Sequence, residues 1–311
     1  MTSTVLDVTL ALTLVSAATV GVAVTDAGGP AMGSGAPLVD VAGTDGNPDP
    51  DPGAAARADR FAGTLTTATT GVNYTLSPGA RRADGSLVEF PRVEGPAFER
   101  HDHGTYASLL ARATVGTVAI RGRPLTHTRD GYARAVRAAV RVLANGSAVN
   151  VTATWRPYPD AHVGGRVAVG PTPPGDRAVH VATTDVPSGV PGARRTALNV
   201  SDGGVDAVAN VVADRLVAGL FPPRDTRVAL GRDYPVSRLV RYRYRRAGEA
   251  YGVPMAEPLA DERVDVANGR LAAVLARAVE RDLDDRFDDP RAAARSIRLD
   301  RVRIVVRTWS R

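Results

Sequence analysis

Cysteine and lysine are both missing from the 311 residues, so all 39 basic side chains are arginine. Without cysteine there can be no disulfide framework, thiol nucleophile, cysteine-ligated zinc site or iron–sulfur cluster. Without lysine there can be no Walker A loop, Schiff-base lysine or kinase-type ATP lysine. The absence of disulfides does not argue against export, because a domain of this size can be stabilised by burial alone.

Aromatic residues are also scarce, at 5% of the chain, although 44% of the residues are hydrophobic. That hydrophobic content is enough for a buried core, which must consist mainly of valine, leucine and alanine. The two tryptophans are Trp155 and Trp309. Each ends an alternating stretch typical of a strand, so we expect both to be buried packing residues and not ligand-stacking ones.

The charge is unevenly distributed along the chain. The first 53 residues contain six carboxylates and no arginine, which leaves 27 of the 33 carboxylates to offset all 39 arginines in the remainder. The remainder therefore has a net charge of +12, although the whole chain has only +6. A body this basic favours polyanionic partners such as nucleic acid, anionic glycan or acidic protein. The alternative is that arginine fills the surface role of both cations in a genome that avoids lysine.

Residues 8–24 form an uncharged stretch near the short end of the length that spans a membrane as a helix. We expect a transmembrane helix or uncleaved signal anchor there, preceded by a short cytoplasmic N-terminus at 1–7. A cleaved signal peptide is the main alternative, but Asp7 lies where such a peptide usually has a basic residue. A soluble helix is the third possibility. Residues 25–58 are rich in Gly, Pro and Asp without periodicity, which predicts a disordered linker.

Four sequons follow the apolar stretch and use four of the seven asparagines in the chain; the candidate glycosylation sites are Asn73, Asn145, Asn150 and Asn199. They favour an extracellular position for residues 59–311, as the C-terminal domain of a single-pass protein of the cell membrane. Asn150 falls on the polar side of an alternating strand, where a glycan would face solvent.

Hydrophobic periodicity predicts the elements of this domain. Apolar residues recur at helical spacing over 106–113, 128–144, 205–220 and 262–287, and Asn145 with Gly146 supplies a helix stop. Alternation or short apolar runs predict strands over 149–156, 166–170, 178–183 and 301–309. Helices and strands come in mixed order without a βαβ repeat, so the predicted fold class is α+β.

Two clusters contain metal-competent side chains. His101, Asp102 and His103 place two imidazoles two residues apart, but no third ligand spacing accompanies them, so an exposed polar loop is the preferred interpretation. Several aspartates crowd the end of the helix predicted at 262–287, without the glycine of a calcium loop, which favours a solvated helix end: Asp282, Asp284, Asp285, Asp288 and Asp289. No HExxH, GxSxG or GxGxxG pattern occurs, so the sequence predicts no catalytic, cofactor-binding or metal-binding residue.

The segment SRLVRYRYRRAG at 237–248 has the most unusual composition in the chain. Interleaved arginine and tyrosine are what phosphate neutralisation combined with base stacking requires. The alternative is a strand or helix with tyrosine inward and arginine outward. The candidate polyanion-binding residues are Arg238, Arg241, Tyr242, Arg243, Tyr244, Arg245 and Arg246.

Three stretches, STVLDVTLALTLVSAATV at 3–20, TATWRPYPDA at 152–161 and VRIVVRTWSR at 302–311, resemble an uncharacterised protein family of haloarchaea. That family is similar to the membrane-anchored components that accompany archaeal type IV pilus and related secretion machinery. The resemblance implies an accessory or structural surface protein and transfers no catalytic residue. The chain differs from pilins proper, because no basic residue with glycine precedes the apolar segment as a processing site.

These observations predict a non-enzymatic cell-surface or envelope protein, an accessory or structural component of a pilus-like or secretion assembly. Its expected partners are the membrane, through the N-terminal helix, and other envelope proteins, with no cofactor. The alternative is an extracellular polyanion-binding module for DNA or anionic glycan that uses the Arg-Tyr segment. A secreted hydrolase is the third hypothesis.

Overall fold

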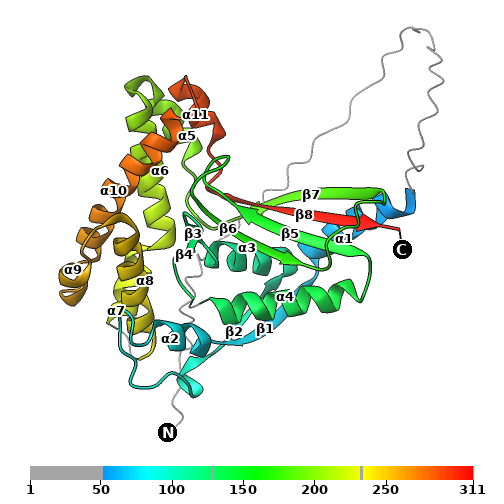
Figure 1. The fold of residues 1–311 in the computed structure, drawn as a ribbon, viewed down its shortest axis with the longest axis horizontal. Helices are drawn as coiled ribbons and strands as arrows, with labels where there is room; N and C mark the ends of the chain where they lie inside the picture. The colour runs from blue at the N-terminus through cyan, green and yellow to red at the C-terminus, as the bar shows by residue number, and fades with distance from the viewer. Residues whose placement is uncertain (1–51, 128, 232–233, 311) are drawn as a thin grey trace.

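The computed structural model describes residues 52–127, 129–231 and 234–310, which form a mixed α+β fold (Figure 1). The N-terminus predicted at 1–7, the membrane helix predicted at 8–24 and the linker up to residue 51 lie outside the described residues. Within the described ranges, no helix is both long and apolar enough to cross a membrane. The linker prediction is wrong at its C-terminal end, because helix α1 begins at Pro52 and places Ala58 and Leu65 in the core.

The helices, in chain order, are α1 (Pro52–Thr67), α2 (Ser77–Ala83), the 3₁₀ turn η1 (Pro96–Phe98), α3 (Tyr106–Gly116), α4 (Asp130–Ala144), α5 (Arg194–Val200), η2 (Ser201–Gly203), α6 (Val205–Leu220), α7 (Pro223–Leu230), α8 (Val236–Tyr251), α9 (Ala256–Ala260), α10 (Val264–Asp284) and α11 (Pro290–Ser296). The strands are β1 (Thr69–Thr75), β2 (Glu99–Thr105), β3 (Ala119–Ile120), β4 (Arg123–Pro124), β5 (Val149–Trp155), β6 (Val163–Val169), β7 (Val179–Pro187) and β8 (Arg301–Trp309).

Six strands form one antiparallel sheet in the order β4-β3-β6-β5-β8-β7, so the C-terminal strand β8 lies inside the sheet. Alternate residues of each strand face the core. On β5 these are Val149, Val151, Ala153 and Trp155, all buried. The neighbouring strands supply mainly valine and isoleucine to the same face, as the apolar alternation of their sequences predicts.

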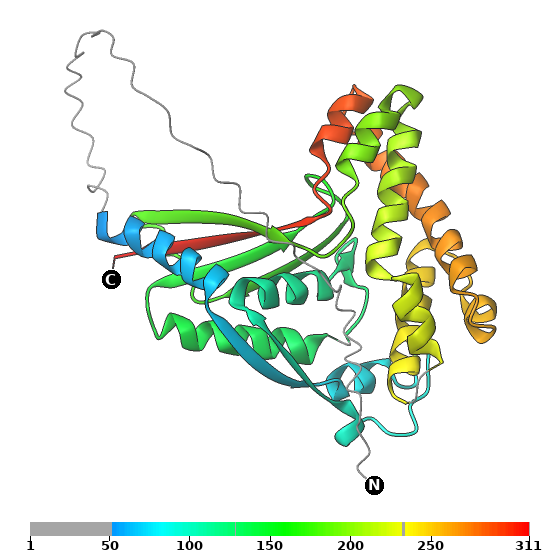
Figure 2. The same ribbon diagram turned by 180° about the vertical axis from the view of Figure 1, so that it is seen from behind.

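Helices α1, α3 and α4 cover one face of this sheet (Figure 2). Trp155 and Gly165 lie side by side on β5 and β6. A Cβ at Gly165 would come within 2.0 Å of the Thr114 carbonyl oxygen of α3, so only glycine lets this helix approach so closely. Trp155 is completely buried and its indole nitrogen donates to the Leu299 carbonyl at 2.8 Å. Trp309 is also buried, so the predicted packing position of both tryptophans is confirmed.

The opposite face of the sheet carries the other alternate residues, which are mostly polar and exposed. It presents Arg166 from β6 and Arg301, Arg303 and Arg307 from β8. Asp185 of β7 lies opposite Arg303 and accepts from its Nε at 3.2 Å. The arginines therefore make this open sheet face basic.

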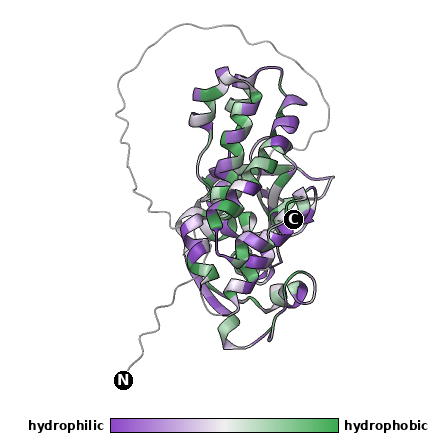
Figure 3. Cartoon of the chain, turned by 90° about the vertical axis from the view of Figure 1, so that its left-hand side faces the viewer, coloured by the Kyte–Doolittle hydropathy of each residue, from purple (hydrophilic) through white to green (hydrophobic). Residues whose placement is uncertain are grey.

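The helices from α5 to α11 form a second layer beside the sheet, in which α6 packs along α10 (Figure 1). Hydrophilic and hydrophobic residues mix along these helices, as expected of amphipathic elements with one buried side (Figure 3). One hydrophobic cluster runs from α1 through the sheet to α6, α8 and α10, so these parts share a core. A smaller cluster joins α2, η1 and α8 through residues that include Phe98, Leu239 and Tyr242.

Every helix and strand predicted from periodicity is present, with ends that shift by a few residues. The predicted stop after the 128–144 helix is confirmed, because Asn145 ends α4 in the left-handed conformation at φ 43°. The antiparallel β1–β2 pair was not predicted, because its β2 sequence ERHDHGT contains no apolar alternation.

Candidate anion-binding site

The Arg-Tyr segment lies on α8, a helix that ends at Gly252 in the left-handed conformation (φ 70°). Residues two apart on a helix point about 200° apart, so Tyr242 and Tyr244 face opposite sides. Tyr242 packs into the smaller cluster and Tyr244 into the main core. Both rings are buried, so the prediction that they stack on a ligand is wrong: neither ring presents a face to solvent.

Hydrogen bonds explain why Tyr244 is fixed in the core. Its hydroxyl donates to Asn268 Oδ1 at 2.7 Å, and the amide nitrogen of Asn268 donates to the Phe221 carbonyl at 2.9 Å. The Tyr244 and Phe221 rings lie 4.3 Å apart. Burial raises the pKa of Tyr244, so the hydroxyl stays a neutral donor at physiological pH.

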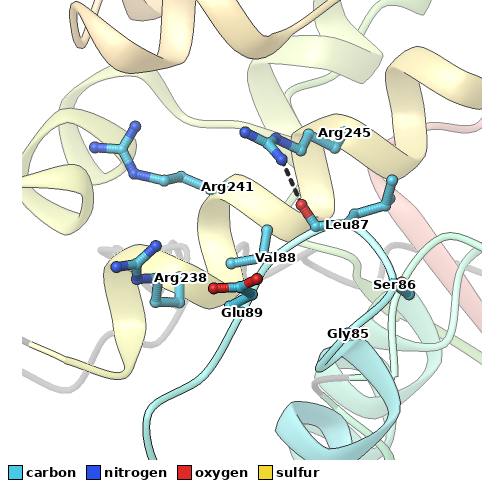
Figure 4. A pocket seen from close by; sticks show the side chains of 8 residues that line it. All are labelled: Gly85, Ser86, Leu87, Val88, Glu89, Arg238, Arg241 and Arg245. Atoms are coloured by element: carbon cyan, nitrogen blue, oxygen red, sulfur yellow. Dashed lines mark hydrogen bonds between the residues drawn. The ribbon is translucent and has the colours of Figure 1, made fainter.

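Three arginines of α8 share one side of the helix because they are spaced at i, i+3 and i+7. Arg238, Arg241 and Arg245 line a pocket of about 370 Å³ together with the loop 85–89 (Figure 4). Arg241 donates to the Leu259 carbonyl and Arg245 to the Leu87 carbonyl. Both guanidinium groups are therefore held by backbone oxygens and not neutralised by carboxylates.

The charge in this pocket is strongly unbalanced. Glu89 is the acidic residue that lines it, and no ion pair joins a carboxylate to Arg238, Arg241 or Arg245 within the described ranges. Arg238 is exposed, and the buried Nε of Arg245 has no hydrogen-bond partner among the described residues. The exposed guanidinium of Arg238 therefore offers N–H donors to an anion, and Arg241 and Arg245 add positive charge.

The structure separates the remaining two arginines of the segment from this pocket. Arg243 is buried beneath the ring of Phe221, with its guanidinium carbon 5.1 Å from the ring centroid. Burial lowers the pKa of Arg243 to about 10. The prediction that the arginines face outward is thus wrong for Arg243. Arg246 lies on another side of α8 and pairs with Glu249 at 3.0 Å.

The four candidate glycosylation sites differ in exposure. Asn73, Asn145 and Asn199 are exposed, and Asn73 Oδ1 lies 2.7 Å from His101 Nδ1. Asn150 is only 8% exposed, and its side-chain nitrogen donates to the Pro171 carbonyl at 3.0 Å. The prediction that Asn150 faces solvent is therefore wrong. β5 lies between two strands in the sheet, where neighbouring side chains cover even its polar residues.

The segment with His101 and His103 is strand β2 and not a loop, which corrects the sequence interpretation. The two histidines are exposed, whereas Asp102 points to the other side. Asp102 accepts from Arg112 Nε at 3.0 Å and from the Tyr132 hydroxyl at 2.7 Å. Within the described ranges, no three His, Cys, Asp or Glu residues gather as metal ligands would.

Two of the aspartates near the end of α10, Asp282 and Asp289, have separate partners. Asp282 accepts from the Tyr158 hydroxyl at 3.0 Å and lies 2.6 Å from His162 Nδ1, so it joins α10 to the turn between β5 and β6. Burial alone would raise the pKa of Asp282, but the hydrogen bonds from His162 and Tyr158 lower it overall. Asp289 caps α11 by accepting from the backbone nitrogens of Arg291 and Ala292. These contacts stabilise the fold.

A family model matches residues 6–309, almost the whole chain. The chain belongs to DUF7284, a family of unknown function. No curated protein and no solved structure matches it significantly.

Sequence reasoning missed the basic side of the sheet. Arg301, Arg303 and Arg307 recur at alternate positions of the predicted C-terminal strand, and this alternation was the available signal. The position of Arg166 beside them follows from strand pairing, which the sequence does not reveal.

Proposed function

We propose that this protein is a non-enzymatic, membrane-anchored surface protein whose folded body binds an anionic polysaccharide through the α8 pocket. The observation that supports it is the pocket bounded by Arg238, Arg241 and Arg245, in which Glu89 is the single lining carboxylate among the described residues. Anchoring and the extracellular position rest on the apolar stretch at 8–24 and on the sequons. Participation in an envelope or pilus-like assembly rests on the resemblance alone.

Burial of the tyrosines favours a polysaccharide over a nucleic acid as the polyanion. Single-stranded nucleic acid is usually held by aromatic side chains that stack on successive bases. Tyr242 and Tyr244 are buried, and none of the described residues that line the pocket is aromatic. The pocket therefore offers positive charge to sulfate, carboxylate or phosphate groups but no aromatic side chain on which successive bases could stack. A pocket of about 370 Å³ has room for a single charged sugar unit of a longer chain.

The affinity for fluorescein-labelled heparin, a sulfated polysaccharide, can be measured by fluorescence anisotropy at NaCl concentrations from about 50 to about 300 mM. We expect measurable affinity that falls with salt, because arginine contacts release condensed counterions. The triple variant Arg238→Gln, Arg241→Gln and Arg245→Gln should lower the affinity. It should also reduce the slope of log affinity against log salt concentration by the amount expected for up to about three lost contacts.

The open sheet face supplies a matched control. The variant Arg166→Gln, Arg301→Gln and Arg307→Gln removes the same charge from exposed or half-buried arginines outside the pocket. It should retain most of the affinity. Equal losses of affinity in both triple variants would show that binding depends only on net charge and would refute a specific role for the pocket. Single-stranded DNA that binds more tightly than heparin would contradict the polysaccharide assignment.

Loss of folding could imitate loss of binding, because Arg241 and Arg245 also hold backbone carbonyls. Arg238→Gln avoids this problem, since Arg238 is exposed and has no such contact. The single variant should weaken heparin binding without changing the melting temperature.

A further inference from the structure

A second basic pocket lies on a different side of α8, against the tight hairpin between β3 and β4. Its volume is about 460 Å³, and its charged lining consists of Arg121, Arg123, Arg246 and Glu249. Glu249 pairs with Arg246, so Arg121 and Arg123 remain without an ion-pair partner within the described ranges. The pocket therefore has two guanidinium groups available for an anion.

The backbone of the hairpin is strained at one of these arginines. Arg121 and Gly122 are the two central residues of the turn, and both have positive φ, 48° and 76°. Such turns favour glycine at the first position, because a Cβ is unfavourable at positive φ, or asparagine and aspartate, whose short polar side chains can hydrogen-bond locally. The Arg121 backbone nitrogen donates to the His162 carbonyl at 2.8 Å, which fixes the hairpin to the end of β6. A long cationic residue at a position suited to glycine points to a requirement for its guanidinium.

The floor of this basic pocket is apolar. Ile120 and Leu125 line it, and the same two residues also line a small apolar cavity of about 30 Å³. Leu216, Leu271 and Tyr251 enclose the cavity from α6, α10 and α8. The two spaces therefore adjoin at Ile120 and Leu125, with charge at the mouth and hydrocarbon beneath it.

We propose that this pocket between the β3–β4 hairpin and α8 binds a small amphiphilic anion, with its phosphate or carboxylate on Arg121 and Arg123 and a short alkyl group against Ile120 and Leu125. The two arginines bind the anionic headgroup through charge-assisted hydrogen bonds, and burial of the alkyl group against the apolar floor adds hydrophobic stabilisation. Tyr251 lines the small apolar cavity behind Ile120 and Leu125; because burial raises its pKa to about 12, it remains neutral there. This site does not depend on the α8 polysaccharide pocket.

Isothermal titration calorimetry of the full chain tests the proposal with three probes: inorganic phosphate, methyl phosphate and n-butyl phosphate. We expect butyl phosphate to bind at least about tenfold more tightly than methyl phosphate, because each buried methylene contributes to affinity. Inorganic phosphate should bind most weakly. Equal affinities for the three probes would overturn the apolar part of the site.

The hairpin offers a variant that separates binding from folding. Arg121→Gly removes the guanidinium and replaces the strained residue by the one that tolerates positive φ, so the melting temperature should stay or rise. Its affinity for butyl phosphate should fall at least about tenfold. Arg123→Gln should weaken binding similarly. If both variants bind as the wild type does, the site is wrong.

Two controls show where the probe binds. Arg134→Gln removes an exposed charge from α4 and should leave the affinity unchanged. Arg238→Gln tests the other pocket of α8 and should also leave it unchanged. A loss in Arg238→Gln with none in Arg121→Gly would place the alkyl phosphate in the polysaccharide pocket and overturn the inference.

Discussion

Replacement of Arg243 by methionine is expected to raise the free energy of unfolding, although it deletes a residue of the Arg-Tyr segment. Burial lowers the pKa of this guanidinium to about 10 from an ordinary value of 12.5. One unit corresponds to 1.36 kcal/mol, so burial costs the charged form on the order of 3 kcal/mol. At pH 7 the group is charged in both the folded and the unfolded state, so this cost acts in full and disappears only above the folded pKa.

The ring of Phe221 offsets part of this penalty. A desolvated cation over an aromatic face gains about 1 to 2 kcal/mol. Methionine retains much of the apolar stem of arginine and needs no hydrogen bonds. The expected net stabilisation by Arg243→Met is therefore about 1 to 2 kcal/mol. Urea denaturation at pH 7 measures it as a higher midpoint with an unchanged slope.

The control for this experiment is Arg134→Met, a change at an exposed position of α4. It should alter stability by no more than about 0.5 kcal/mol. If Arg243→Met is less stable than the wild type, the buried charge has a favourable partner, and the cost derived from its burial is wrong. A change in the denaturant slope would instead indicate an altered denatured or native state.

Three further predictions follow from particular contacts. Trp155 and Ser188 both donate to the Leu299 carbonyl, at 2.8 and 2.6 Å, so the double variant Trp155→Phe/Ser188→Ala should lose at least about 0.5 kcal/mol more than the two single variants together. Simple additivity in a thermal or urea double-mutant cycle would contradict this shared acceptor. Hydrogen bonds lower the pKa of Asp282 in the folded protein. The stabilisation of the fold by its carboxylate is therefore fully present above the pKa of the unfolded state and is lost as the pH falls through the pKa of the folded state. Asp282→Asn should therefore cost about 2 kcal/mol at pH 7 and progressively less as the pH falls from the unfolded pKa through the lower folded one, and a pH-independent cost would refute the ionic contribution. Glycopeptide mass spectrometry should find modification at exposed Asn145 and none at buried Asn150; a glycan on Asn150 of the folded protein would contradict its burial.

Periodicity predicted the long amphipathic elements because their packing depends on one repeated apolar side. Helix α6 spans Val205–Leu220, the range that its spacing predicts, and β8 follows the apolar alternation of 301–309. Short elements lack enough repeats for this signal. The two-residue strands β3 and β4 and the five-residue helix α9 depend on neighbours that only the folded chain provides.

The candidate site was only half predictable. Composition identified the arginines of α8. The positions of the two tyrosines, however, are compatible with either a strand or a helix, so the sequence did not decide between the two. In a helix Tyr242 and Tyr244 must point to different sides. The smaller cluster buries the ring of Tyr242, and the main core buries the ring of Tyr244. The partners of the pocket, Leu87 and Glu89, come from a loop far away in sequence. No local pattern could have joined that loop to α8.

A net charge of +12 is not by itself evidence for an anion site, because many arginines of the body have carboxylate partners. Arg81, Arg227 and Arg263, for example, pair with acidic residues on the surface. Such pairs contribute little to stability, and their opposite charges cancel at distances beyond the screening length of about 8 to 10 Å. The potential that a polyanion meets is therefore determined by the arginines without such partners, which the structure gathers in a few places. Arg166 and Arg307 of the open sheet face also have no ion pair within the described ranges, so what distinguishes Arg238, Arg241 and Arg245 is that they line one pocket. Removal of these three charges should therefore matter more than removal of three charges from the open sheet face, and the comparison of the two variants distinguishes a site from a merely basic surface.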